Sequence, residues 1–150
     1  MDGEARFETF TVLITKIRRS IQRIKSEEMS EYNLKSPHVS CIYCLYKRGP
    51  MTATQLCEFC DEDKAAISRS LVQLEEKGFV SCSSGNKKRY RAVLELTEEG
   101  RAVASGIAQK IDRVLKDAGI GISEEERIIM YKNLTMISEN LEKVCLKYDK

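Results

Sequence analysis

Apolar side chains recur along the first thirty residues with a seven-residue period. They stand at alternating steps of three and four positions, at Phe7, Phe10, Ile14, Ile17, Ile21 and Ile24. This spacing places them on one seam of a helix, which is typical of a helix that packs lengthwise against another. We therefore expect a helix over 4–28 and a polar link over 29–35. The seam suits either an intramolecular core or a contact with a second chain.

Helix-capping residues divide the next part of the chain into two shorter helices. Ser36 followed by Pro37 predicts a helix start with Ser36 as the N-cap, and Gly49-Pro50 predicts its end. Thr52 and Gln55 have the spacing of a capping box, which predicts another helix start.

A longer helix is predicted between 63 and 77. Asp61 and Asp63 are both suitable N-caps, and Gly78 after Lys77 is a typical helix stop. Its apolar stripe follows steps of four and three, at Ile67, Leu71 and Leu74. Its polar face carries small, hydroxylated or cationic side chains, of the kind that lie against a groove floor or a phosphate: Lys64, Ala65, Ser68, Arg69 and Gln73.

Two β-prone runs follow, at Phe79-Val80 and 92–96, with the turn sequence Ser83-Ser84-Gly85-Asn86 between them. A helix-turn-helix followed by a hairpin is the order of a winged helix, which usually binds duplex DNA. Between 64 and 91, seven Lys or Arg residues stand against two Glu residues. Starting the count at Asp61 reduces this excess, so the basic character is local.

Two further amphipathic helices are predicted after the hairpin. Thr97 should cap one that ends near Asp117, and a capping box from Ser123 to Glu126 should open another that reaches about Lys147. A lone winged helix of this size does not need these long helices as well as the first one. We therefore expect a homodimer joined by residues 4–28 and 105–148.

Several blocks of this sequence resemble the MarR family of transcriptional regulators, in register from about Ser36 to Arg101. The blocks are Gly49-Pro50-Met51-Thr52, Gln55-Leu56, Ile67-Ser68-Arg69, Leu74-Glu75-Glu76-Lys77-Gly78-Phe79-Val80 and Leu94-Glu95-Leu96-Thr97-Glu98-Glu99-Gly100-Arg101. The resemblance implies a mainly α fold with a small β-hairpin wing. It implies one domain over 1–150, with the winged helix-turn-helix at 36–100 and dimerisation helices at both ends.

The resemblance also implies a ligand-responsive repressor that binds a pseudo-palindromic operator as a homodimer and responds to a small aromatic or anionic effector. In relatives an arginine at the wing tip enters the minor groove, and Arg89 stands at that position here. Members often carry an aspartate just before it, where this chain has Lys88. The predicted DNA contacts are Ser36, His38, Thr52, Thr54, Gln55, Lys64, Ala65, Ser68, Arg69, Gln73, Lys87, Lys88 and Arg89. His38, in the first turn of its helix, is expected at the surface or on a phosphate.

Composition and the absence of certain motifs argue against several classes of protein. The net charge of +2 gives no global attraction to nucleic acid, and 42% hydrophobic residues argue against disorder. The N-terminus does not resemble a signal peptide, and the apolar runs are too short to span a membrane, so we expect a cytoplasmic protein with no membrane partner. We find no phosphate loop, nucleophile motif or paired-histidine metal motif, and expect neither an enzyme nor a cofactor. The alternative to DNA binding is a winged helix used as a protein-interaction module.

Six cysteines include two C-x2-C pairs, Cys41/Cys44 and Cys57/Cys60, whose spacing alone resembles a four-cysteine zinc site. Both pairs fall inside helical patterns, where free cysteine serves as a small core residue. We expect buried reduced thiols and no metal. A thiol-based redox sensor and a zinc-responsive regulator remain the alternatives.

Overall fold

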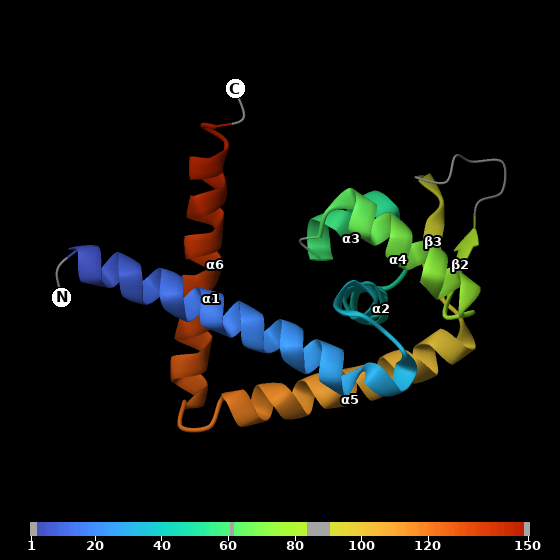
Figure 1. Cartoon of the computed structure of the whole chain (residues 1–150), viewed down its shortest axis with the longest axis horizontal. Helices are drawn as coiled ribbons and strands as arrows, with labels where there is room; N and C mark the ends of the chain where they lie inside the picture. The colour runs from blue at the N-terminus through green and yellow to red at the C-terminus, as the bar shows by residue number, and fades with distance from the viewer. Residues whose placement is uncertain (1–2, 61, 84–90, 149–150) are drawn as a thin grey trace. The chain divides into compact units, whose positions relative to one another are not determined.

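The computed structural model describes residues 3–60, 62–83 and 91–148, except for the side chains of Glu4 and Phe7. The chain divides into two compact units, Met1–Lys110 and Ile111–Lys150. Figure 1 shows the helices and the small sheet, with the sheet beside α3 and α4. The predicted class, a mainly α protein with a small β wing, is confirmed.

The elements of the first unit follow the predicted order. They are α1 (Gly3–Glu28), η1 (Ser30–Tyr32), α2 (Ser36–Arg48), β1 (Met51–Thr52), α3 (Ala53–Cys60), α4 (Lys64–Glu76), β2 (Val80–Ser83), β3 (Val93–Leu96) and the first part of α5 (Glu98–Ala118). The helices expected at 4–28, 36–48, from 52 and at 63–77 are confirmed to within a few residues, and so are the two hairpin strands.

The core of this unit lies where α2 packs on α3 and α4. The predicted α4 stripe of Ile67, Leu71 and Leu74 is buried. It is joined by buried side chains of the neighbouring elements: Val39, Ile42 and Leu45 of α2, Leu56 of α3, Val80, Leu94 and Leu96 of the sheet, and Ala104 and Ile107 of α5. Removing these apolar surfaces from water is the main term that stabilises the unit.

Two of the predicted caps are confirmed by their hydrogen bonds. The Thr52 backbone N–H donates to Gln55 Oε1 at 2.9 Å, and the Gln55 N–H donates to Thr52 Oγ1 at 3.3 Å. Asp63 Oδ1 accepts from the Ala66 N–H at 2.9 Å at the start of α4. These bonds satisfy backbone donors that the first turn of a helix leaves without partners.

The start of α2 differs from the prediction. Lys35, with extended backbone, is the N-cap, while Ser36 is already helical. The Lys35 backbone N–H donates to Nδ1 of His38 at 2.9 Å. The histidine three residues on therefore does the capping work that the sequence assigned to the Ser36 side chain.

The interpretation of 29–35 as a polar link is also wrong. Met29 and Leu34 are buried, and Ser30–Tyr32 forms a 3-10 turn between them. Lys110 of α5 holds this turn, because its Nζ lies 2.6 Å from the Glu31 carboxylate and 2.8 Å from the Glu28 carbonyl oxygen. Residues 29–35 therefore form a turn that is fixed to α5 and that contributes two side chains, Met29 and Leu34, to the core.

The sheet has three antiparallel strands in the order β1-β3-β2. Sequence patterns predicted two of them and missed β1, which pairs Met51 with Leu94 and Thr52 with Val93. A two-residue strand carries no period of its own, so only the partner strand reveals it. β1 ties the start of α3 to the wing.

A close approach joins the end of α4 to the start of α5. Gly78 stops α4 with φ 73°, a left-handed conformation that favours glycine. Thr97 Oγ1 donates to the Gly78 carbonyl oxygen at 2.6 Å and accepts from the Gly100 N–H at 3.0 Å. At Gly100 a Cβ would overlap the carbonyl of Phe79. Glycine is required here because two backbones touch.

The second unit consists of the end of α5, a turn and α6 (Glu124–Cys145). Ser123 and Glu126 form the predicted capping box, with bonds of 2.8 and 3.2 Å. No side chain of α6 is buried in a single chain. Among the described residues, no helix has the length and apolar character that crossing a membrane requires.

Gly100→Ala should destabilise the protein by about 1–3 kcal/mol, because the added methyl group meets a backbone carbonyl that cannot move alone. Chemical denaturation followed by circular dichroism measures the free energy of unfolding.

Gly106→Ala is the matched control in the same helix. There the new Cβ would meet the Tyr32 hydroxyl at 2.6 Å, the end of a side chain that can rotate away. The loss should therefore be smaller than for Gly100→Ala. Equal stabilities of the two variants would contradict the proposed backbone contact.

Candidate nucleic-acid interface

One face of α4 is turned away from the core. All five of its predicted contact residues are exposed: Lys64, Ala65, Ser68, Arg69 and Gln73. The opposite face holds the stripe that packs into the core. The predicted polar face is therefore available to a partner along the length of the helix.

One residue on the exposed face of α4, Val72, was not among the predicted contacts. Val72 is an apolar side chain, 37% exposed, one helical turn from Ser68 and Arg69. An exposed apolar group between polar ones suits contact with the methyl group of thymine. The helical spacing could have placed Val72 on this face, because it lies off the stripe of Ile67, Leu71 and Leu74.

α4 is held in place at both ends of its polar face. Asp63 caps its first turn, and the side chain of Gln73, near its end, interacts with that of His38. Gln73, predicted to contact the DNA backbone, is thus positioned by a neighbour on α2. A preset side chain loses less conformational freedom when it meets a partner.

The expectation that His38 lies at the surface is wrong. Its side chain is 4% exposed and has partners in Lys35 and Gln73. Burial lowers the pKa of His38, although the Gln73 hydrogen bond opposes this, and the charges of Lys35 and Lys77 add to the lowering. The neutral ring accepts from the Lys35 N–H, so His38 serves as an interior hydrogen-bonding residue, and its contact with a phosphate stays a prediction.

The residues predicted on the α3 side fall into two groups. Thr52 and Gln55 hydrogen-bond each other as the cap of α3. Thr54 is exposed and lies on the pocket described next. Ser36 is half-buried in the first turn of α2. Thr54 therefore lies close to the exposed face of α4, whereas Thr52 and Gln55 cap the start of α3.

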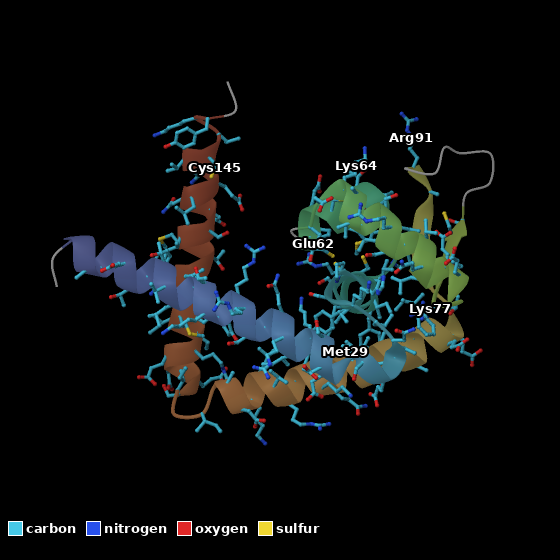
Figure 2. The ribbon with its side chains drawn as sticks, in the orientation of Figure 1. Met29, Glu62, Lys64, Lys77, Arg91 and Cys145 are labelled. Atoms are coloured by element: carbon cyan, nitrogen blue, oxygen red, sulfur yellow. The ribbon has the colours of Figure 1, made fainter. Side chains whose placement is uncertain are left out.

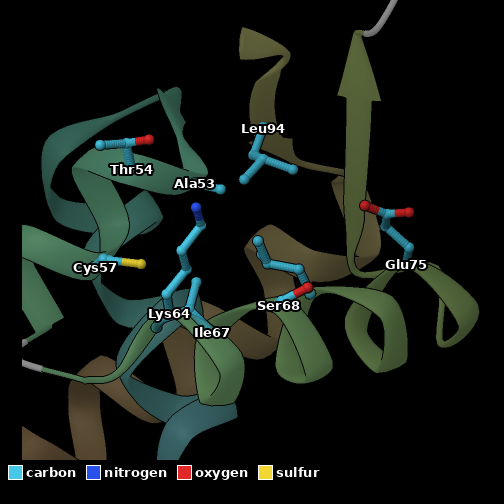
Figure 3. A pocket seen from close by; sticks show the side chains of 9 residues that line it. Ala53, Thr54, Cys57, Lys64, Ile67, Ser68, Glu75 and Leu94 are labelled. Atoms are coloured by element: carbon cyan, nitrogen blue, oxygen red, sulfur yellow. The ribbon is translucent and has the colours of Figure 1, made fainter. Parts of the chain in front are cut away.

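A pocket of about 430 Å³ lies between α3, α4 and β3. Figure 3 shows the Lys64 side chain extending into it from α4, with Thr54 and Cys57 on the α3 side. The other lining residues form a mostly apolar floor with a hydroxyl and a carboxylate: Ala53, Ile67, Ser68, Leu71, Glu75 and Leu94. The pocket combines a cation, hydroxyl groups and apolar surface, and it shares Lys64 and Ser68 with the exposed α4 face.

The wing is described at its base. β2 and β3 pair from Val80 with Leu96 to Ser83 with Val93. Arg91 is exposed beside the start of β3, and Figure 2 shows Arg91 and Lys64 projecting away from the core. The predicted minor-groove residues Lys87, Lys88 and Arg89 lie outside the described residues, so their role stays a prediction.

The cysteines are in part as predicted. Cys41 and Cys44 are buried and reduced, while Cys57 and Cys60 are half-buried. Within the described part of the chain, no group of three or more His, Cys, Asp or Glu is arranged to hold a metal ion. That the protein needs no metal stays a prediction.

Comparison with known proteins fits this geometry. Residues 34–87, which contain α2, α3, α4 and β2, match the model of the MarR family. Over this segment the chain is similar to the MarR family. It is 31% identical over 86 residues to YwoH, an uncharacterized HTH-type transcriptional regulator of Bacillus subtilis, an alignment that covers 57% of this chain and 62% of that protein.

Solved structures of this family have the same fold. Staphylococcus aureus MarR in complex with salicylate and kanamycin has a TM-score of 0.80 at 17% identity, over 94% of this chain and 95% of its own. S. aureus MepR in its DNA-binding conformation has a TM-score of 0.79 at 18% identity, over 88% of this chain and 98% of its own. At these identities the likeness establishes the MarR winged-helix fold.

The stability of the protein should fall as the pH falls below about 6.5, the ordinary pKa of histidine. The folded pKa of His38 lies below its usual value of 6.5, so the unfolded chain binds the proton more readily. The contribution of neutral His38 is complete above about pH 6.5 and is lost as the pH falls through the folded pKa. Urea unfolding at several pH values measures this.

His38→Asn is the comparison variant, because asparagine offers an oxygen acceptor to the Lys35 N–H and does not titrate. His38 is the only histidine of the chain, so the variant should flatten the pH dependence in this window. An unchanged slope would show that His38 does not carry it.

Proposed function

We propose that this chain is a ligand-responsive transcriptional repressor of the MarR type that binds a pseudo-palindromic DNA operator as a homodimer. The observation that carries the proposal is the exposed polar face of α4, which is held on a packed core beside the base of a β-hairpin. In winged-helix proteins such a helix enters the major groove. A repressor of this kind needs only to occupy its site on DNA.

The proposed contacts divide by chemistry. Arg69 and Gln73 are proposed to contact phosphates, which fix the register of the protein on the duplex. Lys64, Ala65 and Ser68 are proposed to meet base edges, and Val72 a thymine methyl. The wing, through Lys87 to Arg89, is proposed to reach the adjacent minor groove. Two copies of α4 about 34 Å apart would meet successive major grooves of one operator.

The proposed homodimer follows from apolar surface that one chain leaves exposed. On α1, the predicted seam is more than a third exposed at Phe10, Ile14, Ile17, Ile21 and Ile24. On α6, the exposed large hydrophobic residues include Ile128, Ile129, Leu134, Met136, Leu141 and Val144. Contiguous apolar faces of this extent mark sites of association. Both helices belong to the proposed dimerisation segments, 4–28 and 105–148, of one MarR-type domain.

The pocket between α3 and α4 is proposed as a site for the effector. The Lys64 ammonium suits an anionic group, and the Ile67, Leu71 and Leu94 side chains suit an aromatic ring. Salicylate, which is both aromatic and anionic, is bound by the S. aureus relative. Because Lys64 and Ser68 also belong to the proposed DNA face, an effector here would compete with DNA directly.

Arg69→Ala should weaken binding to a duplex selected from random DNA and lower the slope of log K against log salt by about one unit. Removing one phosphate contact releases one counterion fewer, which is the reason for the change in slope. Fluorescence anisotropy over a potassium chloride series measures both quantities.

Lys132→Ala is the matched control, because it removes the same charge from an exposed position on α6. Its affinity and salt slope should equal those of the unaltered protein. If no duplex is selected at all, or if Arg69→Ala leaves both quantities unchanged, α4 is a protein-contact surface instead.

Ile17→Glu should convert the dimer into monomers, because a charge placed on a 53% exposed seam residue would be buried in the proposed interface. Gln22→Glu adds the same charge to α1 away from the seam and should leave the dimer intact. Sedimentation velocity at micromolar concentration distinguishes the two results. A monomeric unaltered protein would refute the dimer.

A further inference from the structure

The middle of α1 carries a concentrated positive charge. Residues 9–26 contain five Lys or Arg residues and no Asp or Glu. Because the whole chain has a net charge of only +2, the residues outside this segment together carry a net charge of −3. Residues 9–26 therefore form a local basic region that the net charge of the protein conceals.

Three of these cations lie in a row along the helix, which we call the basic row. Lys16, Arg19 and Arg23 stand at steps of three and four, so they point to the same side of α1. All three side chains are exposed. Among the described residues, no carboxylate forms an ion pair with any of them. The basic row therefore presents its full charge to solvent.

The basic row points away from both surfaces that α1 offers for packing. With 3.6 residues per turn, its mean direction lies about 150° around the helix axis from the apolar seam. Lys25 marks the side of α1 that meets α2, because its Nζ donates to Ser40 Oγ at 3.1 Å. Lys25 also lies about 150° from the mean direction of the row. A dimer formed on the seam would therefore leave the basic row exposed.

The chemistry beside the basic row favours phosphate groups over a protein surface. Ser20 and Ser26 are exposed next to the row, and serine hydroxyls join Arg and Lys in contacts with the DNA backbone. A protein contact centres instead on aromatic or other buried anchor residues. Along the line of the row the only large apolar side chain is Val12, at the N-terminal end.

The length of the basic row also suits a DNA strand. Lys16 and Arg23 are seven positions apart, which is about 10 Å along an α-helix. One strand of duplex DNA carries a phosphate for about every 3.4 Å of its axis. Three cations over this length therefore match about three successive phosphates.

We propose that the basic row of α1 binds the phosphate backbone of duplex DNA, independently of base sequence and separately from the α4 face. Each cation of the row pairs with one phosphate and releases one counterion. Backbone contacts carry no base information, so the row adds affinity without specificity. This second contact goes beyond the proposed function, because it requires neither an operator nor the exposed face of α4.

The test compares two variants of the full chain for binding to a short duplex of arbitrary sequence. The row variant combines Lys16→Gln, Arg19→Gln and Arg23→Gln. The control variant removes the same charge from exposed positions of α5 and α6, through Lys116→Gln, Lys132→Gln and Lys143→Gln. Fluorescence anisotropy over a potassium chloride series measures the affinity and its salt dependence.

The row variant should lower the slope of log K against log salt by about 2.7 units for each row in contact, because each phosphate contributes about 0.9. The affinity advantage of the unaltered protein over the row variant should then shrink about fortyfold between about 50 mM and about 200 mM salt. The control variant should keep the affinity and slope of the unaltered protein. Equal slopes for the two variants would overturn the proposal.

Crosslinking gives a second measurement, which decides if circular dichroism or sedimentation velocity shows that the row variant does not fold or dimerise as the unaltered protein does. A benzophenone amino acid at position 19 should crosslink to the duplex, whereas one at position 132 should not. The absence of a crosslink from position 19 would overturn the proposal. So would a row variant that differs from the control only in binding polyglutamate, because the row would then be a contact for an acidic protein.

Arg69→Ala in the same assay separates this proposal from the proposed function. If the row variant lowers the salt slope and Arg69→Ala does not, the basic row binds DNA and the proposed role of α4 fails. If Arg69→Ala lowers the slope and the row variant does not, α4 binds DNA and the proposed role of the basic row fails.

Discussion

The packing of α4 on α2 is the contact on which the rest of the first unit depends. Ile67, Leu71 and Leu74 occupy one side of α4, so their burial against α2 decides which side remains exposed. Because a helix repeats every 3.6 residues, burying one stripe fixes the direction of every other side chain on it. The exposed cationic face is therefore a consequence of the core and cannot be turned without breaking it.

Polar contacts add to the apolar packing that holds α4 in its orientation. His38 joins the start of α2 to the end of α4 through Lys35 and Gln73, and it does so from inside the protein. Thr97 joins the end of α4 to the start of α5, where Gly100 permits two backbones to touch. Each contact links two elements, so the end of α4 is tied both to α2 and to α5.

The long helices near the chain ends, α1 and α6, differ from α4 because their apolar side chains are largely exposed in a single chain. α6 has no buried side chain, and the seam of α1 remains largely exposed in a single chain. Isolated helices are marginal in water without tertiary packing. The winged part buries its own apolar side chains, whereas α6 and the α1 seam leave theirs exposed in a single chain, which supports the proposed dimer.

Local signals in the sequence determined most of the secondary structure. Capping pairs such as Thr52/Gln55 and Ser123/Glu126, the stripe of α4 and the stop at Gly78 each act within a few residues, so each could be read directly. The exposed residues of α4 followed, because helical periodicity assigns each position to a face. The resemblance to a family added the arrangement of these elements.

Contacts between distant segments were decided only by the tertiary structure. β1 exists because β3 pairs with it, and His38 is interior because Gln73, thirty-five positions later, lies beside it. Such contacts leave no local period or cap in the chain, because their energy arises only when the two segments meet.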